Sequence, residues 1–402
     1  MDTVLLFGAG AGQLPYLRDF RARGLRVCVI DRSAEAPGAG EADDLLQVST
    51  HDDAAILGLL REYGLDRRLV AVACPATGWA GVAAARVAAQ LGLRFASEEA
   101  VLDVLDKQRL WRRLREAGLT RRDCRVFAAG DDVDAPLPAV VKPCRLGGTS
   151  RGVSHCADAL QLRDAVARAA AMSLDGLALA ESYLPGPEVK LAGLLQGGRA
   201  RVAVVAARSF GPGPLGVPIG LAIGPAADAA ADPLPQLVDV FERFCAAAGL
   251  PDVVFNTDFI LAATGPELID VDIALGSFRG LVADACDADL AALHSRLCLG
   301  EPLGDDVNCR RGAAVTYLWC AGNDGRRDAL LSAAESAVDG GRFVPDPGLM
   351  QGATVDGPRR VGALHSAGAT REAAAGAGRD WLERVQRRLL DGDNPARVVL
   401  PA

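Results

Sequence analysis

The chain has 402 residues, half of them hydrophobic, which is enough for two or three domains with buried cores. Its formal net charge of -8 argues against a general nucleic-acid binder. No run of about eighteen apolar residues is free of charge, and the start lacks the positive region of a signal peptide, so we expect no membrane span and no leader.

The ten cysteines are scattered, with no CxxC pair and no metal-type spacing. This usage is typical of buried thiols in a reducing cytosol and not of a disulfide framework. We therefore predict a cytoplasmic protein.

Lysine is nearly absent from the chain. Only Lys107, Lys142 and Lys190 are lysines among 43 basic residues. A lysine kept where arginine is the usual choice is a candidate for a compact ammonium with a specific task, such as a phosphate contact. The alternative is that a lysine is retained by chance, and this alternative is strongest for Lys190.

Residues 1–104 alternate strand and helix. Apolar strands are predicted at residues 4–7, 27–30 and 69–74, with helices at 13–23 and 79–91. This pattern predicts a doubly wound α/β domain around a parallel sheet.

Residues 105–310 form a second predicted unit, with a lid at about 125–180. Helices are expected at residues 107–117, 157–171 and 233–248, and strands at 139–141, 177–181, 188–195, 253–261 and 267–273. The segment 210–224 is rich in glycine and proline, which predicts a long loop. Residues 311–402 are expected to form a third, α+β part that packs on the second, with strands at 313–320 and 361–365 and a helix at 370–390.

A glycine-rich turn follows the first strand. Gly8 and Gly10, with Asp31 closing the next strand, resemble a dinucleotide fingerprint, in which backbone amides approach a pyrophosphate and an acid holds a ribose. Gln13 occupies the last glycine position of that fingerprint. Any tight strand-to-helix turn needs glycine, so we interpret the turn as structural and keep NAD binding as an alternative.

Lys142 ends a predicted strand and precedes a glycine-rich turn over residues 145–152. An ammonium beside small residues and hydroxyls suits triphosphate binding. No Gly-Lys-Ser/Thr follows, so the turn is not a Walker A loop. A plain surface hairpin is the alternative.

Carboxylates follow in two places. Glu181 and Glu188 bracket a Pro-Gly turn and could accept bonds from an amino group or from ribose hydroxyls. Asp258 lies on one predicted strand, and Asp270 and Asp272 share a face of the next. Acids on apolar strands are costly unless they meet a cation, which favours a magnesium site over a rim of exposed acids.

Taken together, these motifs resemble the ATP-grasp superfamily over nearly the whole chain. The resemblance rests on Lys142-Pro143 with its glycine-rich turn, the E-x-x-x-x-G-x-E pattern from Glu181 to Glu188, and the two acidic strands. The N-terminal part resembles the pre-ATP-grasp domain of that superfamily. Residues 357–362 and 369–373 resemble the closing domain of its amino-acid-ligase-like and carboxylase-like members.

The resemblance implies a role for each matched position. Lys107 and Lys142 would contact ATP phosphates, Glu181 the adenine amino group, and Glu188 the ribose. Backbone at Tyr183 and Leu184 would line the base, and Asp258, Asp270 and Asp272 would ligate Mg²⁺. A mobile lid over the triphosphate would contain Gly147, Gly148, Thr149, Ser150 and Gly152.

One departure from the superfamily pattern concerns Ala274. The usual E-x-N-P-R reads here as D-V-D-I-A, so the arginine that steadies the acyl-phosphate or acceptor region is replaced. We hypothesise that Arg279 or Arg208 supplies that cation, although either could be a surface arginine.

The resulting prediction is an ATP- and Mg²⁺-dependent carboxylate–amine ligase. It would join small substrates, such as amino acids, through an acyl phosphate, without nucleic-acid or membrane partners, and a homodimer would suit the apolar first domain. Three alternatives stay open: an ATP-grasp enzyme acting on bicarbonate or a nucleotide-pathway amine, a degenerate ATP-binding module, and an NAD-dependent oxidoreductase.

Overall fold

The N-terminal part of the molecule is built on a small parallel sheet. A computed structural model describes residues 1–76, 78–146, 151–213, 216–225, 233–276, 278–286, 288–304, 307–321, 327–351, 359–391 and 397–400. The sheet has the strand order β3-β2-β1-β4. Its strands are β1 (Thr3–Phe7), β2 (Arg26–Asp31), β3 (Asp44–Gln47) and β4 (Leu69–Ala73).

Helices cover both faces of this sheet because successive side chains on each strand point to opposite sides. Val4 and Leu6 pack with α1 (Leu14–Ala22) and with α9 (Leu290–Cys298), which returns from later in the chain. Leu5 and Phe7 pack with α2 (Asp53–Glu62) and α3 (Ala80–Leu91), and a short 3₁₀ turn, η1 (Asp66–Arg68), precedes β4. The doubly wound arrangement predicted for this part is confirmed.

Two consecutive helices lead out of the N-terminal part into a smaller antiparallel unit. The helices are α4 (Glu98–Leu105) and α5 (Lys107–Glu116). The unit has the strand order β5-β8-β6-β7 and is covered by α6. Its elements are β5 (Cys124–Ala128), β6 (Ala139–Pro143), β7 (Ser154–Cys156), α6 (Ala159–Met172) and β8 (Leu177–Ser182).

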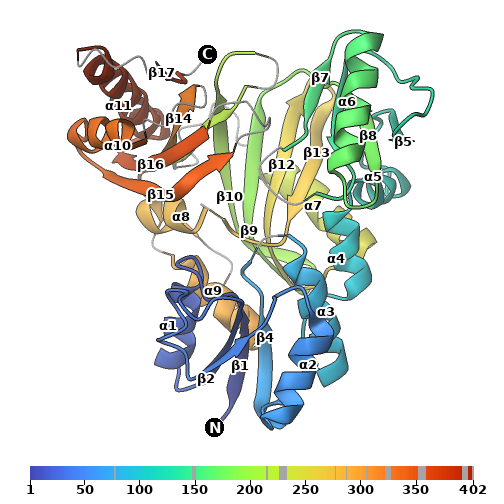
Figure 1. The fold of residues 1–402 in the computed structure, drawn as a ribbon, viewed down its shortest axis with the longest axis vertical. Helices are drawn as coiled ribbons and strands as arrows, with labels where there is room; N and C mark the ends of the chain where they lie inside the picture. Colours follow the sequence, from blue (N-terminus) through green and yellow to red (C-terminus); the bar gives the residue numbers. More distant parts are fainter. Residues whose placement is uncertain are drawn as a thin grey trace.

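A large antiparallel sheet forms the centre of the molecule (Figure 1). Its strand order is β13-β12-β9-β10-β11-β14-β16-β15, and β17 pairs with β14. The strands are β9 (Glu188–Gln196), β10 (Arg199–Phe210), β11 (Pro218–Ile223), β12 (Val253–Ala262), β13 (Gly265–Asp272), β14 (Gly312–Ala321), β15 (Arg342–Gln351), β16 (Arg359–Gly368) and β17 (Arg397–Val398).

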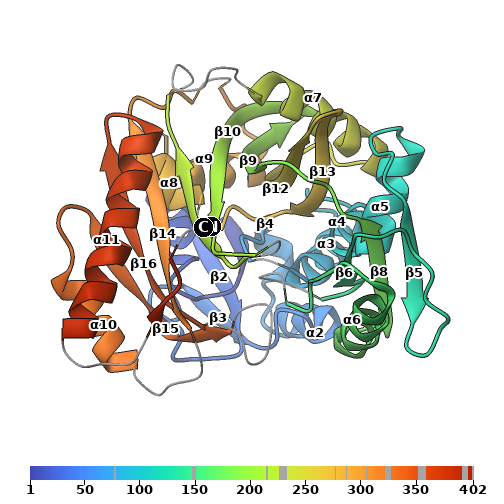
Figure 2. The same cartoon turned by 90° about the horizontal axis from the view of Figure 1, so that it is seen from above.

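Helices pack on both faces of the large sheet. On one face, α7 (Leu234–Ala248) packs on Val189 and Leu191, and on the other, α8 (Phe278–Ala285) packs on Ala192 and Leu194. At the far end of the sheet lie α10 (Arg327–Ser336) and α11 (Arg371–Asp391). Viewed from above, these two helices and the α6 unit stand on opposite sides of the central strands (Figure 2).

Two expectations need correction. The segment 210–224 is not one long loop, because residues Pro218–Ile223 form β11 between β10 and β14. The cysteines are not all free of disulfides: Cys286 and Cys309 form one, while the other eight are in none. A pairing between positions 23 residues apart has no sequence signal, because it depends on the two segments meeting in space as an antiparallel bridge.

No helix in the described ranges is long and apolar enough to cross a membrane.

Candidate active site

The first group of charges in the candidate site surrounds Glu181 at the end of β8. Lys142 on the adjacent strand β6 places its Nζ 2.8 Å from Glu181 Oε1, and Arg122 donates to Glu181 Oε2 at 2.5 Å. All three side chains are nearly buried. Burial raises the pKa of Glu181, but Lys142 and Arg122 lower it more, and the net pKa lies below its usual range. Glu181 is therefore an ionised carboxylate that holds Lys142 in place.

This group also joins the small sheet to the large one. Lys142 Nζ donates to the Ile269 carbonyl at 3.3 Å, and Arg122 Nη2 donates to the Leu268 carbonyl at 2.7 Å. Both carbonyls belong to β13, at the edge of the large sheet. The candidate phosphate-binding lysine and the acidic strands predicted from sequence are thus neighbours in space.

A second group of charges lies on β13, β12 and β9. Asp258 is directly opposite Asp270 on one side and opposite Lys190 on the other. Lys107 contacts Asp270, and Lys190 Nζ lies 2.5 Å from Asp258 Oδ1. Desolvation raises the pKa of Asp270, but Lys107 and then Lys142 lower it more, and the net pKa is below its usual value. All three lysines of the chain therefore meet carboxylates that were predicted as site residues.

Asp270, Asp258 and Lys190 form a row of charges across β13, β12 and β9, and Arg208 on β10 extends it by one strand. Its Nη1 contacts Glu188 and lies 3.2 Å from Asp258 Oδ1, and its guanidinium lies 4.9 Å from the centre of the Phe210 ring. Glu188, expected at a ribose, is therefore part of the same ionic row as Asp258. Burial raises the pKa of Glu188 more than Arg208 lowers it.

Asp272 has an unsatisfied carboxylate oxygen. Its Oδ1 is buried without a hydrogen-bond partner, and burial, followed by the neighbouring charge of Asp270, raises its pKa to about 6. No three His, Cys, Asp or Glu side chains converge at metal-binding distance within the described residues. Mg²⁺ usually takes one or two carboxylates and completes its shell with phosphate oxygens and water, so the donor set of Asp272 and Asp270 fits a nucleotide-bound Mg²⁺ better than a free ion.

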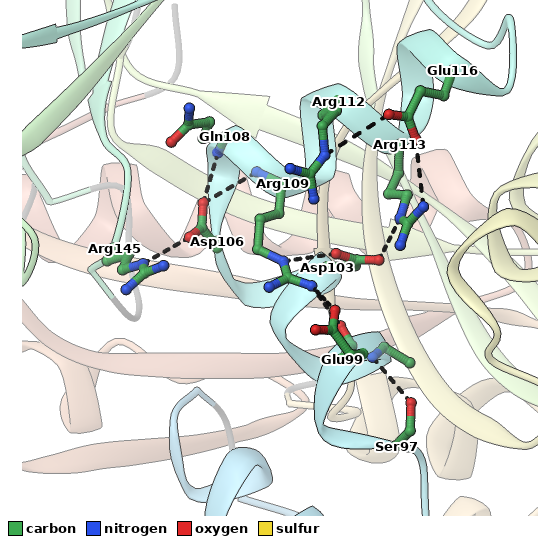
Figure 3. Close-up of polar contacts among 11 residues, drawn as sticks. Ser97, Glu99, Asp103, Asp106, Gln108, Arg109, Arg112, Arg113, Glu116 and Arg145 are labelled. Carbon is green, nitrogen blue, oxygen red and sulfur yellow. Dashed lines mark hydrogen bonds and ion pairs between the residues drawn. The ribbon is translucent and has the colours of Figure 1, made fainter.

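Lys107 is held at the start of α5 by the residue before it. Asp106 is 2% exposed, and its Oδ1 accepts from the backbone N–H groups of Gln108 and Arg109, at 3.0 and 3.1 Å. Its Oδ2 accepts from Arg145 Nε at 2.7 Å (Figure 3). The backbone N–H of Lys107 also donates to the Cys144 carbonyl at 3.0 Å. These contacts tie the helix that carries Lys107 to the end of the strand that carries Lys142.

The bend between α4 and α5 contains a second buried acid. Asp103 is 1% exposed and accepts from Arg109 Nε at 2.8 Å and from Arg113 Nε at 2.5 Å (Figure 3). Two charge-assisted bonds to one buried carboxylate fix the angle between the two helices.

The residues predicted to face the base lie just after β8. Tyr183 donates its backbone N–H to the Pro138 carbonyl at 2.9 Å, and its ring meets His155 edge-on at 4.8 Å between centroids. Leu184 is half-buried. Gly152 has a φ of 73°, which suits glycine. The other predicted lid residues lie outside the described ranges: Gly147, Gly148, Thr149 and Ser150.

The glycine-rich turn after β1 is satisfied by the chain itself. Asp31 accepts from the Ala9 backbone N–H at 2.9 Å and from the Ser33 N–H at 2.9 Å. The Gly38 N–H donates to the Ala9 carbonyl at 2.7 Å. The acid that would hold a ribose thus holds the turn, which favours the structural interpretation over a dinucleotide site.

The two arginines proposed as replacement cations are in different places. Ala274 is fully buried and supplies no charge. Arg208 contacts the acids of the row. Arg279 lies at the start of α8 and is close enough to Tyr16 to lower the pKa of that phenol, although burial raises this pKa by more. Arg279 forms no ion pair with an acid of the described residues, so the geometry favours Arg208.

Sequence reasoning missed two contributors. Arg122, 3% exposed, is one of many arginines and carries no sequence signal that separates it from the others. Asn256, which accepts from Lys190 Nζ at 3.1 Å, lies opposite Asp272, and only the strand register reveals that position.

Comparison with known proteins identifies the fold. No protein-family model and no curated protein matches the sequence. Among solved structures, L-amino acid ligase from Bacillus licheniformis is similar over 100% of this chain and 99% of its own, with a TM-score of 0.74 at 16% identity. N5-carboxyaminoimidazole synthase from Aspergillus clavatus, in complex with ADP and 5-aminoimidazole ribonucleotide, is similar over 96% and 99%, with a TM-score of 0.72 at 15% identity.

A third similar structure is phosphoribosylglycinamide synthetase from Anaerococcus prevotii, which aligns over 99% of both chains with a TM-score of 0.65 at 13% identity. The chain therefore has the ATP-grasp fold over its whole length, as the sequence motifs predicted.

Proposed function

We propose that the protein is an ATP- and Mg²⁺-dependent ligase that joins a small carboxylic acid to an amine. The observation that carries this proposal is the convergence of all three lysines on the carboxylates of β8, β12 and β13. A nucleoside triphosphate binds where several fixed cations neutralise its phosphates. The Mg²⁺ that accompanies it needs carboxylates beside those cations. The similar solved structures include an L-amino acid ligase and an N5-carboxyaminoimidazole synthase with ADP bound, which supports the use of ATP.

The chemistry that this arrangement supports has two steps. A carboxylate oxygen of the substrate attacks the γ-phosphorus of ATP, the bond to the β,γ-bridging oxygen breaks, and ADP leaves with that electron pair. The amine nitrogen then attacks the acyl carbon, phosphate leaves, and the nitrogen loses a proton. The protein contributes positioning and charge neutralisation in both steps.

The residues of the chain divide this work. Lys107 and Lys142 would hold phosphate oxygens, and Asp270 and Asp272, with Asp258 beside them, would hold Mg²⁺ together with phosphate oxygens and water. The ion would supply further neutralisation of the phosphates. Because Glu181 already binds Lys142 and Arg122, its contribution to adenine recognition is shared with its role in orienting Lys142. Backbone groups at Leu184 complete the base site.

Amino acids are the substrates we favour, because the L-amino acid ligase structure has a TM-score of 0.74, above the 0.72 and 0.65 of the two other structures compared. A test measures ADP formation with Mg-ATP against single and paired amino acids and small carboxylic acids, bicarbonate included. We expect ADP release that requires an acid–amine pair and that Lys142→Gln abolishes. Release with bicarbonate alone would redirect the proposal to carboxylation, and no release with any acid would refute it.

A further inference from the structure

Lys190 lies in the middle of a row of charged side chains that crosses four adjacent strands. Asp270 on β13 is opposite Asp258 on β12, and Asp258 is opposite Lys190 on β9. Arg208 on β10 reaches Glu188 and Asp258 from the other side. The row therefore has the two acids Asp270 and Asp258 at the end near Lys107, and two cations, Lys190 and Arg208, with Glu188 at the end near β10.

The ammonium of Lys190 is not saturated by its neighbours. It contacts Asp258 Oδ1 at 2.5 Å and Asn256 Oδ1 at 3.1 Å. A lysine ammonium has three donors, and the described residues provide two acceptors. The side chain is 14% exposed, so its neighbours do not enclose it completely.

We propose that Lys190 is a catalytic residue that binds the carboxylate of the acid substrate. This inference rests on the proposed ligase function and extends it to a residue to which the sequence motifs assign no role. Lys107 and Lys142 lie on the β13 side of the row, where they serve the nucleotide. Lys190 lies beyond Asp258, on the side towards Arg208, and the proposal places the carboxylate of the acid substrate on that side.

A change of partners at Asp258 links the two binding events. Without nucleotide, Asp258 neutralises Lys190. If Asp258 held the Mg²⁺ of a bound nucleotide, Lys190 would lose its ion-pair partner, and the loss of that contact is unfavourable for a nearly buried cation. Asn256 keeps the ammonium oriented with a neutral oxygen, and the substrate carboxylate takes the vacant place. The acid substrate therefore binds more tightly after Mg-ATP than before it.

The same position assists the reaction. A carboxylate and a γ-phosphoryl group are both anions, and they must come into contact for the new oxygen–phosphorus bond to form. An ammonium that contacts the carboxylate offsets this repulsion and remains beside the acyl phosphate that results. Ala274 offers no charge, so Lys190 and Arg208 are the cations of the large sheet that can serve here.

The test compares Lys190→Gln, Lys190→Arg and Lys142→Gln, after thermal melting has shown that each variant is folded. For Lys190→Gln we expect a KM for the acid substrate at least about tenfold higher and a kcat/KM about a hundredfold lower, with Mg-ATP affinity unchanged or tighter. Lys190→Arg should recover part of the loss, because it keeps the charge. Lys142→Gln should instead weaken Mg-ATP binding.

A second readout does not require turnover. Calorimetric titration of Mg-ADP should give equal or tighter binding to Lys190→Gln than to the unmodified chain, because Asp258 no longer has a resident cation. Weaker Mg-ADP binding to Lys190→Gln would assign Lys190 to the nucleotide and overturn the inference, as would an unchanged KM for the acid. If the unmodified chain turns over no acid at all, the proposed function fails. The Mg-ADP titrations alone then decide whether Asp258 exchanges Lys190 for the nucleotide.

Discussion

Single residues in the site neutralise one another before any ligand is present. Lys107 is paired with Asp270, Lys190 with Asp258, and Lys142 with Glu181. Such buried pairs contribute little net stability, because desolvation offsets most of their attraction. Their value here is geometric: each ammonium is held where a phosphate or carboxylate can replace its present partner.

Part of this arrangement could be predicted from the residues alone. Lysine scarcity and the two-residue spacing of Asp270 and Asp272 indicated which charges belong to the site. The pairing of Lys190 with Asp258 could not be predicted, because it depends on the register between β9 and β12. The role of Arg122 could not be predicted either, because its partner Glu181 is 59 positions away and the chain has many other arginines.

His294 should make the stability of the protein depend on pH. Burial lowers the pKa of His294 from 6.5 to about 4, so the folded chain keeps the imidazole neutral while the unfolded chain protonates it below pH 6.5. The stability it contributes is therefore fully present above pH 6.5 and is lost as the pH falls towards 4. We expect the loss from this group to approach about 3 kcal/mol in urea unfolding.

His294→Asn is the control for that experiment. This variant lacks the titrating group, so its stability should fall less between pH 6.5 and 4.5 than that of the unmodified chain. Equal slopes would show that the imidazole is not kept neutral by burial.

Among the elements, the bend between α4 and α5 decides where Lys107 points. Asp103 fixes the angle between the helices through Arg109 and Arg113, and Asp106 caps α5 and binds Arg145 (Figure 3). The position of Lys107 is thus a property of the whole bend and not of one side chain.

Asp106→Ala should damage both stability and nucleotide binding. Loss of the helix cap costs about 1–2 kcal/mol. Loss of the Arg145 contact frees the start of α5, so Mg-ATP affinity should fall at least about tenfold, a coupling of about 1.4 kcal/mol. Calorimetry and urea unfolding measure the two effects separately.

Asp52→Ala is the matched control, because Asp52 caps α2 in the N-terminal part through a 3.0 Å bond from Ala55. It should cost similar stability and leave Mg-ATP affinity unchanged. If both cap variants affect ATP binding equally, Asp106 has no special role in placing Lys107.

The predicted elements were most accurate where periodicity was strong. Helices at residues 107–117 and 233–248 correspond to α5 and α7, each within about one residue at its ends. Strand β11 was missed because glycine and proline dominate its surroundings and its partners β10 and β14 are distant in sequence. Pairing with those neighbours outweighs the weak local preference.

At the scale of the whole molecule, the C-terminal part is continuous with the large sheet. Strand β14 pairs with β11 on one side and β16 on the other, and Gly378 of α11 lies directly against Thr316 of β14. The predicted third part is therefore an extension of the central sheet, and we expect both to unfold together.

Trp381→Ala tests that continuity. Trp381 is fully buried, and its Nε1 donates to the Ala334 carbonyl at 3.0 Å. The substitution should cost about 3–5 kcal/mol, through a cavity and a carbonyl without its partner, and should lower a single cooperative transition. Leu390→Ala on the same helix, at a side chain 51% exposed, should cost less than about 0.5 kcal/mol. Two separate transitions in Trp381→Ala would mean that the C-terminal part folds independently.

The central claim is that the lysines and acids of helix α5, the small antiparallel sheet and the large sheet form one nucleotide site, and direct calorimetric titration tests it. Mg-ATP should bind the unmodified chain at one site, Lys142→Gln should reduce its affinity at least about a hundredfold, a loss of about 2.7 kcal/mol, and NAD should not bind. Failure of the unmodified chain to bind Mg-ATP, or equal binding by Lys142→Gln, would contradict the account.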